Sequence, residues 1–430
     1  MGTDSFLIGL CVIGALAIAT RPAGVAETIA NTNKNAVPRG RLDSIDVLRG
    51  LVMVIMAIDH TRDFFTNPGF EATDLSRTTT AYFFTRWITH FCAPVFVFLA
   101  GTGAFLSGAR GKPKKELSWF LLTRGLWLIF LELTVVRFSL FFNIDYHESF
   151  LQVIWVIGVS MIVLAGLVFL PTKIVTGFGL TIVVFHNVLD RFNPEQFGSF
   201  RWLWALLHGS VGPIPPNPPN ALEWHSGYFI LVLYPLIPWV GVLAAGYGFG
   251  QLYKMDQERR RKILRYLGLG LILGFVVLRA TNVYGDPHAW ATQKNGWFTF
   301  LSFLNCEKYP PSLLYLMMTL GPAILLLSFL ERDLGAVARP FVIFGRVPLF
   351  YYLIHFPFLH LLAGVFAVIK FGPSILDAKL DPATGPPPGW GFSLPVMYLI
   401  WLGVILVMYP LCRWFANLKM HRRDAWLSYF

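Results

Sequence analysis

Residues 46–63 read DVLRGLVMVIMAIDHTRD, in which nine uncharged residues separate two groups of charged side chains. In a helix that turns about 100° per residue, the eleven steps from Arg49 to His60 bring these side chains within roughly 20° of each other, about 16 Å apart along the axis. Asp46 and Asp63 fall on the same broad stripe. Lipid would not tolerate this stripe, so we expect the helix face to lie against protein, water or a ligand.

The whole chain has the composition of a polytopic membrane protein. Of its 430 residues 55% are hydrophobic and only 14% are charged, whereas soluble proteins carry about 25% charged residues. Many apolar runs are about 20 residues long, enough to cross a hydrocarbon core roughly 30 Å thick. We therefore predict an all-α transmembrane bundle of about ten or eleven spans. Ten candidate spans after residue 40 are 44–64, 84–107, 117–141, 149–170, 172–189, 226–253, 264–282, 311–330, 341–369 and 391–412.

Basic residues alternate between the loops that join these spans. One set of connections holds the clusters 110–115, 254–265 and 413–423, whereas the opposite set holds only scattered lysines and arginines. The positive-inside rule places the first set in the cytoplasm and predicts a cytoplasmic C-terminus. The net charge of +11 then reflects the basic residues that gather in the loops on one face of the membrane, and it does not indicate a nucleic-acid partner.

The chain divides into residues 1–40, an apolar helix with a linker, and residues 41–430, a multi-span membrane domain. The apolar stretch 5–20 lacks the positive N-terminal region of a signal peptide. An uncleaved anchor fits better and gives the eleventh span, while cleavage or a dispensable extension stays open. The four cysteines show neither metal-ligand nor CxxC spacing, and no metal site is predicted.

His60 is the first candidate for a catalytic group. Its carboxylate neighbours Asp59 and Asp63 could orient the imidazole ring and raise its basicity, although Asp59 could instead pair with Arg62. His90, at the entry of the second span, is a second catalytic candidate. An imidazole suits acyl transfer because it works as a base or nucleophile near neutral pH with little perturbation.

Arginines form a second group of candidates. Arg49, Arg124 and Arg346 lie near the predicted cytoplasmic ends of their spans, where their planar side chains could bind phosphates. Anchoring to lipid headgroups is an alternative for each, and Arg49 could also pair with Asp46. We expect Glu132 to neutralise an arginine of another helix. Further polar residues inside spans are Arg137, His186, Asp190, Arg279, His355 and His360.

Six stretches carry a resemblance to a known family. They are Arg41–Gly50, Asp59–Phe65, Ala93–Gly103, Tyr234–Gly241, Lys308–Ser312 and Phe344–His355. The chain resembles, over residues 40 to 430, the bacterial membrane proteins of the heparan-α-glucosaminide N-acetyltransferase catalytic-domain family. The spacing of Arg49 and His60 is also similar to the signature of the wider transmembrane acyltransferase superfamily.

The resemblance implies transfer of an acetyl group across a bacterial inner membrane. Acetyl-CoA would be used from the cytoplasmic side, and an amino sugar or glycan would be acetylated on the outer side. His60 takes the role of the catalytic histidine and Arg49 that of its motif partner. In the lysosomal member the catalytic histidine lies in a lumenal segment that does not align residue by residue, so His90 stays open as the reacting group. Because the chain resembles bacterial members of the family, heparan sulfate is not the expected acceptor.

We therefore predict a membrane acetyltransferase whose partners are the lipid bilayer, acetyl-CoA and a saccharide acceptor, with a homo-oligomer left open. One alternative is a proton-coupled secondary transporter that relays protons through its histidines and carboxylates. Another is a non-catalytic scaffold. The charges gather at the helix ends instead of forming a continuous path, which favours the enzyme.

Overall fold

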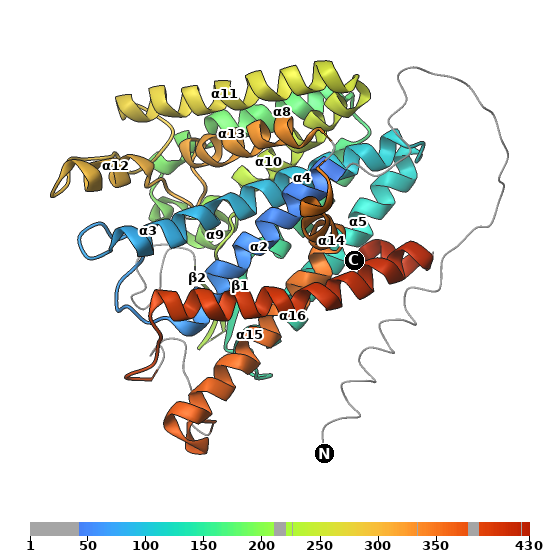
Figure 1. Cartoon of the computed structure of the whole chain (residues 1–430). Helices are drawn as coiled ribbons and strands as arrows, with labels where there is room; N and C mark the ends of the chain where they lie inside the picture. Colours follow the sequence, from blue (N-terminus) through green and yellow to red (C-terminus); the bar gives the residue numbers. More distant parts are fainter. Residues whose placement is uncertain (1–42, 210–220, 226, 333, 377–386, 423) are drawn as a thin grey trace.

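The computed structural model describes residues 43–209, 221–225, 227–332, 334–376, 387–422 and 424–430. The predicted helix at 5–20 and the predicted division at residue 40 lie outside the described residues. The described part is a bundle of long helices with one small sheet (Figure 1).

The first half of the chain contributes α2 (Asp43–Phe65), α3 (Thr80–Trp87), α4 (Cys92–Ala109), α5 (Lys114–Leu131), α6 (Arg137–Phe141), α7 (Val153–Leu167), α8 (Thr172–Phe185) and α9 (Arg201–His208). The second half contributes α10 (Leu236–Phe249), α11 (Gln257–Thr281), α12 (Gly296–Leu304), α13 (Leu313–Leu330), α14 (Arg339–Arg346), α15 (Pro348–Phe371) and α16 (Leu394–His421). The short 3-10 helix η1 (Ile88–Phe91) continues α3, and the π-helix η2 (Glu132–Val136) continues α5.

The prediction of a helical membrane bundle is confirmed. Within the described residues, seven helical segments are long and apolar enough to cross a membrane. The three other predicted spans coincide with α2, which carries many charges, and with the shorter helices α7 and α10.

Two predicted spans begin too early, because their first residues form strands. The strand β1 (Glu148–Leu151) pairs in parallel with β3 (Tyr228–Val232), which pairs antiparallel with β2 (Ala221–His225). Short apolar runs of this kind are compatible with a strand or with the start of a helix, and periodicity alone cannot separate the two. A third predicted span, 341–369, is broken at Val347 into α14 and α15. Pro348 has no N–H to donate and is suited to start a new helix.

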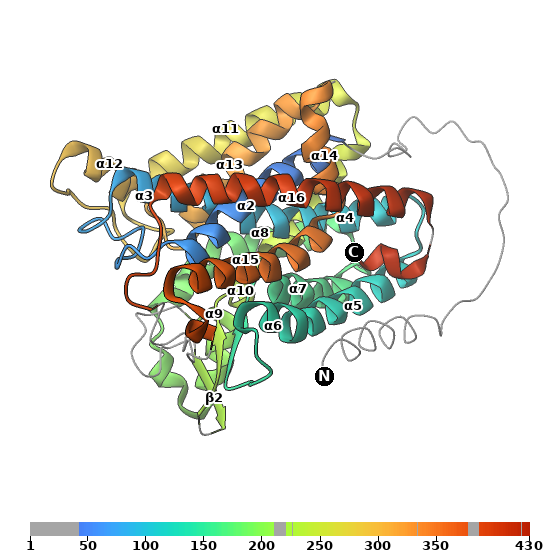
Figure 2. The ribbon, with the colours of Figure 1, turned by 60° about the horizontal axis from the view of Figure 1, so that its bottom comes forward.

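Helix α2 lies at the centre of the site region and contacts α4, α13, α14, α15 and α16. Figure 2 shows α16 lying across this group, with α15, α7 and α5 below it in that view. The start of α2, the end of α4, the start of α5 and the end of α16 form one end of the bundle, which we call the basic end. It lies toward the right in Figure 1.

The backbones of α2 and α14 touch at two glycines. A Cβ atom on Gly50 would overlap the backbone oxygen of Phe341, and one on Gly345 would overlap the backbone oxygen of Asp46. Only glycine permits this approach, because any side chain would force the helices apart. The close contact sets Arg49 and Arg346, the neighbours of these glycines in sequence, beside each other at the basic end.

Candidate active site

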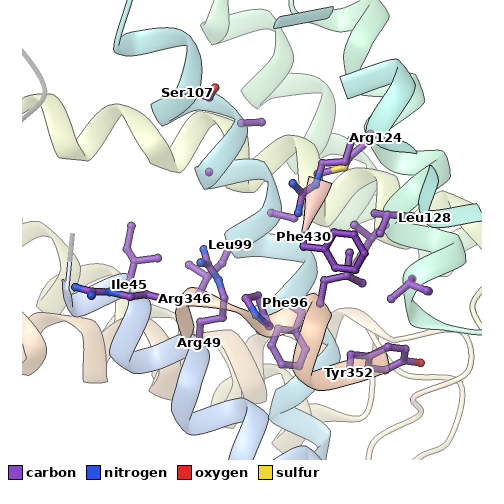
Figure 3. A pocket seen from close by; sticks show the side chains of 18 of the residues that line it. Ile45, Arg49, Phe96, Leu99, Ser107, Arg124, Leu128, Arg346, Tyr352 and Phe430 are labelled. Carbon is purple, nitrogen blue, oxygen red and sulfur yellow. The ribbon is translucent and has the colours of Figure 1, made fainter. Parts of the chain in front are cut away.

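A cavity of about 440 Å³ opens among α2, α4, α5, α7 and α15 at the basic end. We call it the arginine cavity. Its cationic lining residues are Arg49, Arg110, Arg124, Arg346 and Lys419, and Asp46 is its acidic lining residue. The three arginines expected to bind phosphates, Arg49, Arg124 and Arg346, come from three different helices and surround this one space (Figure 3).

Each of these arginines is held by the protein while it lines the cavity. Arg49 donates to the Asp46 carboxylate at 3.4 Å and to the Gly345 carbonyl at 3.2 Å. Arg346 forms ion pairs with Asp43 at 3.6 Å and with Asp46 at 3.9 Å. Asp46 is thus shared by two cations, so the lining keeps an excess of positive charge. This charge suits an anionic ligand.

Arg124 joins the cavity to the last residues of the chain. Its guanidinium donates to the Ser428 carbonyl at 2.6 Å, and Thr123 and Tyr429 are joined through their hydroxyls at 2.8 Å. The aromatic ring of Phe430 lines the cavity beside Arg124 (Figure 3). The contacts of Arg124 and Thr123 with this segment thus hold Phe430 in the wall of the arginine cavity.

A second, smaller cavity of about 40 Å³ lies further along α2 and contains His60. We call it the His60 cavity. Its polar lining residues are Asp59, His60, Thr89, Gln152, Tyr234, Lys308 and Tyr352. Phe96, Val153 and Tyr352 line both cavities. These three residues, which we call the neck, lie between the two spaces.

The ring of His60 is held by His355 of α15, a fully buried residue. His60 Nδ1 lies 2.6 Å from His355 Nε2, while His355 Nδ1 lies 3.0 Å from the Tyr351 carbonyl and 2.8 Å from the Tyr352 carbonyl. Carbonyl oxygens only accept, so His355 Nδ1 carries a proton, and in the neutral ring Nε2 is then an acceptor. His60 Nδ1 must therefore donate, which leaves His60 Nε2 as the unprotonated, basic nitrogen. Phe356 packs on the same ring, with centroids 4.2 Å apart.

The two carboxylates expected to orient His60 are engaged elsewhere. Asp59 forms ion pairs with Arg62, at 3.0 Å, and with Arg86. Asp63 binds Arg62 at 2.6 Å and its side chain is 55% exposed. The hydrogen-bond partner of the His60 ring is thus a histidine from a distant helix and neither of the neighbouring acids.

His90, the second catalytic candidate, is buried against α13. Its ring packs on Tyr315, with centroids 5.4 Å apart, and its carbonyl accepts a 2.7 Å hydrogen bond from the Tyr315 hydroxyl. His90 lines neither the arginine cavity nor the His60 cavity. Among the described residues, no group of three or more His, Cys, Asp or Glu could hold a metal ion.

The sequence predicts that Glu132 pairs with an arginine, and this prediction is wrong for the described part of the chain. The Glu132 carboxylate accepts a 3.0 Å hydrogen bond from the backbone N–H of Trp155. It therefore caps the start of α7, where Val153 of the neck lies. A helix start has unpaired N–H groups and a partial positive charge, which explains why a buried carboxylate is stable there.

Lys308 and His355 belong to the site although neither was assigned a role from the sequence. Both lie in stretches that carry the family resemblance, Lys308–Ser312 and Phe344–His355. Lys308 and His355 follow His60 by 248 and 295 positions, and the periodicity of one helix cannot link residues so far apart. The family resemblance is therefore the signal in the sequence that points to these two residues.

The loop before α13 carries Lys308 and is strongly anchored. Buried Arg279 donates to four backbone carbonyls of residues 288–305, among them Asn305 at 2.7 Å, and pairs with Asp286 at 3.5 Å. Outside the spans, a hydrogen bond to Glu307 raises the pKa of His288, and burial raises the pKa of Asp286. The loop is thus a rigid support for the side chains that it carries toward His60.

Comparison with known families gives a match over the first part of the chain. Residues 41–281, more than half of the chain, match the family described as "Heparan-alpha-glucosaminide N-acetyltransferase, catalytic". The matched part includes α2 with Arg49 and His60, and it ends at the last residue of α11. No curated protein matches the sequence.

Proposed function

Because the chain belongs to the heparan-α-glucosaminide N-acetyltransferase catalytic family, whose activity is acetyl-CoA-dependent N-acetylation within a membrane, we propose a path for the acetyl group through this bundle. Acetyl-CoA binds in the arginine cavity, its thioester passes the neck, and the acetyl group is transferred beside His60. The acceptor, an amino sugar or a glycan, approaches from the end of the bundle opposite the basic end.

One observation supports this proposal: the arginine cavity and the His60 cavity lie side by side and share the lining residues Phe96, Val153 and Tyr352 of the neck. Coenzyme A has anionic phosphates at one end and a thiol at the end of a long uncharged arm. The cationic lining suits the phosphates, and the apolar neck suits the arm. A cofactor in this orientation would present its thioester to His60.

The chemistry follows from the unprotonated Nε2 of His60. In one route Nε2 removes a proton from the acceptor amine as the amine nitrogen attacks the thioester carbon, and then returns the proton to the departing thiolate. In the other route Nε2 attacks the thioester carbon and CoA leaves as its thiolate. The acceptor amine then displaces Nε2 from the acetyl carbon and releases a proton, which neutralises the thiolate. Both routes require the tautomer that His355 imposes.

The direction of transfer rests on the basic loops. The positive-inside rule puts the basic end in the cytoplasm, where acetyl-CoA is made available, and the His60 end toward the outer face. We therefore propose a multi-pass enzyme of the bacterial inner membrane that acetylates an extracytoplasmic acceptor.

The test compares purified protein with its His60→Ala variant in detergent, by CoA release from acetyl-CoA with glucosamine as acceptor. Loss of a positioned acid–base group lowers turnover by about 10²- to 10⁴-fold. His421→Ala, which alters an exposed histidine bonded to Asn417, should retain full activity. Undiminished turnover in His60→Ala would contradict the proposal, and so would the lack of any thermal stabilisation by CoA.

Radiolabelled acetyl-CoA without acceptor separates the two routes. Label that stays on the wild type but not on His60→Ala identifies an acetyl-histidine. Acceptor-dependent turnover with no retained label identifies His60 as the base.

A further inference from the structure

Lys308 is a buried cation in the His60 cavity. Only 8% of the residue is exposed, and the side chain lines the same 40 Å³ space as His60 and Asp59. Burying an ammonium group is costly unless an anion compensates it. No ion pair to Lys308 occurs in the part of the chain that the structure describes. Its ammonium group is hydrogen-bonded to the uncharged Tyr309 side chain, whose ring centroid lies 4.9 Å from Nζ.

The acidic residues nearby are already shared by other cations. Asp59 is paired with both Arg62 and Arg86, and Asp63 with Arg62. Two carboxylates therefore face three cations once Lys308 is included. This cluster has room for one additional negative charge.

We propose that Lys308 is a catalytic residue that stabilises the oxyanion formed on the thioester carbonyl during acetyl transfer. This inference rests on the proposed function. When a nucleophile bonds to the carbonyl carbon, the π electron pair of the C=O bond moves onto oxygen and creates the charge that Lys308 Nζ–H donates to. When the C–S bond breaks, the C=O bond re-forms and the charge leaves with the thiolate; in the base route the thiolate takes the amine proton held by His60, and in the acetyl-histidine route it takes the proton that the amine releases when it displaces Nε2 from the acetyl group.

Several hydrogen-bond donors near His60 are already engaged within the described residues, while the Gln152 amide and the Tyr234 hydroxyl, which also line the cavity, are uncharged and so weaker donors toward an anion. The Thr61 hydroxyl donates to the Ala57 carbonyl at 2.7 Å, and the Thr89 hydroxyl to the Arg86 carbonyl at 2.7 Å. The start of α7 donates to Glu132. The Tyr352 hydroxyl, which has no hydrogen-bond partner among the described residues, is a rival donor, but it is uncharged and so weaker toward an anion.

The His60 cavity is small, about 40 Å³. Because Lys308 lines the same space as His60, an acetyl group that enters it from the neck brings its carbonyl oxygen toward the Lys308 side chain.

The surrounding loop holds Lys308 in advance of the reaction. The Glu307 carboxylate accepts the backbone N–H of Lys308 at 2.9 Å, and Asp286 accepts the Glu307 N–H at 2.9 Å and the Ser312 hydroxyl at 2.7 Å. Donors that need no reorganisation stabilise a developing charge most effectively.

The test measures kcat and KM for acetyl-CoA, with glucosamine as acceptor, in Lys308→Met and Lys308→Arg. Removal of one oxyanion donor lowers kcat by about 10²- to 10³-fold. We expect that loss in Lys308→Met, a KM within a few-fold of wild type, and partial recovery in Lys308→Arg. Lys294→Met, at an exposed lysine that packs on Phe298, is the matched control and should keep its activity.

A second measurement holds even if Lys308→Met folds poorly. Fluoroacetyl-CoA forms an intrinsically more stable oxyanion, so its turnover depends less on Lys308. The ratio of fluoroacetyl to acetyl turnover, taken in one preparation, is independent of the folded fraction. We expect this ratio to rise in Lys308→Met, and an unchanged ratio overturns the inference.

Two further outcomes also overturn it. One is a loss confined to anionic acceptors such as glucosamine 6-phosphate, which would make Lys308 an acceptor-binding residue. The other is a loss in Tyr352→Phe with none in Lys308→Met. If the wild type fails to transfer acetyl groups at all, the proposed function fails; if His60→Ala is inactive and Lys308→Met is normal, only the present inference fails.

Discussion

His60 Nδ1 of α2 lies 2.6 Å from His355 Nε2 of α15, and His355 Nδ1 donates to backbone carbonyls of its own helix. The direction of each hydrogen bond is therefore determined by groups that can only accept. The chain of bonds leaves His60 Nε2 without a proton and keeps it ready to act as base or nucleophile.

Replacing His355 tests this arrangement. His355→Ala removes the acceptor of the His60 Nδ1 proton, so the ring can exchange tautomers and rotate. We expect kcat to fall by roughly 10- to 100-fold, less than the loss expected for the reacting group itself, and the pH profile of kcat/KM to shift. His355→Gln offers a carbonyl oxygen as acceptor and should recover part of the activity.

A matched control lies one turn and a half further along α15. His360 donates to the Ser139 carbonyl at 3.0 Å and lines neither cavity, so His360→Ala should keep its activity and pH profile. Normal turnover in His355→Ala would refute the role that we give to the histidine pair.

The arginine cavity gives a prediction about affinity. Arg49→Gln, Arg124→Gln and Arg346→Gln should each weaken CoA binding, because a hydrogen bond to a charged group contributes about 1.5–3 kcal/mol, or roughly 10- to 150-fold in Kd. Calorimetric titration with CoA measures the loss, which should shrink at high salt.

Titration with dephospho-CoA, which lacks the 3′-phosphate, identifies the arginine that binds this group. The variant of that arginine should bind dephospho-CoA as tightly as the wild type does, whereas the other two variants should bind it more weakly. The control is Lys262→Gln, at an exposed lysine of α11 that pairs with Glu258 at 3.0 Å. Unchanged Kd values in all three arginine variants would remove the arginine cavity from the proposed path.

The neck gives a prediction about acyl length. Phe96 lines both cavities, so Phe96→Ala should widen the passage and raise the turnover of propionyl-CoA relative to acetyl-CoA. A single methylene in an apolar pocket changes discrimination by about 10- to 200-fold. Phe178→Ala, at an exposed side chain of α8, should leave the ratio unchanged; an unchanged ratio in Phe96→Ala would show that the neck does not select the acyl group.

The glycine contact between α2 and α14 gives a prediction about stability. Gly345→Ala would push its methyl group into the Asp46 backbone, and overpacking of this kind costs about 1–3 kcal/mol. We expect a lower Tm in detergent, with weaker CoA binding because Arg49 and Arg346 separate. Gly364→Ala is the control, because a Cβ at Gly364 meets no atom within 4 Å and alanine favours the helix by up to about 1 kcal/mol. Equal Tm values for the two variants would contradict the close packing.

The helices were predictable because each membrane span must satisfy its own backbone hydrogen bonds with a long apolar run. The errors were local. The strand β3 is as apolar as the span that follows it, the end of β1 leads directly into an apolar run, and the break at Val347 lies close to the start of another predicted span. The expectation that Glu132 pairs with an arginine also failed, because the sequence does not reveal which helix start lies beside it.

By itself the sequence determined the spans and the stripe that carries Arg49 and His60, because both depend on the period of a single helix. Only the tertiary structure decided that Arg124 and Arg346 surround the same cavity as Arg49, and that His355 and Lys308 reach His60. These residues are brought together by packing, at Gly50 and Gly345 and through the loop anchored by Arg279. Such contacts join residues hundreds of positions apart, and no local pattern encodes them.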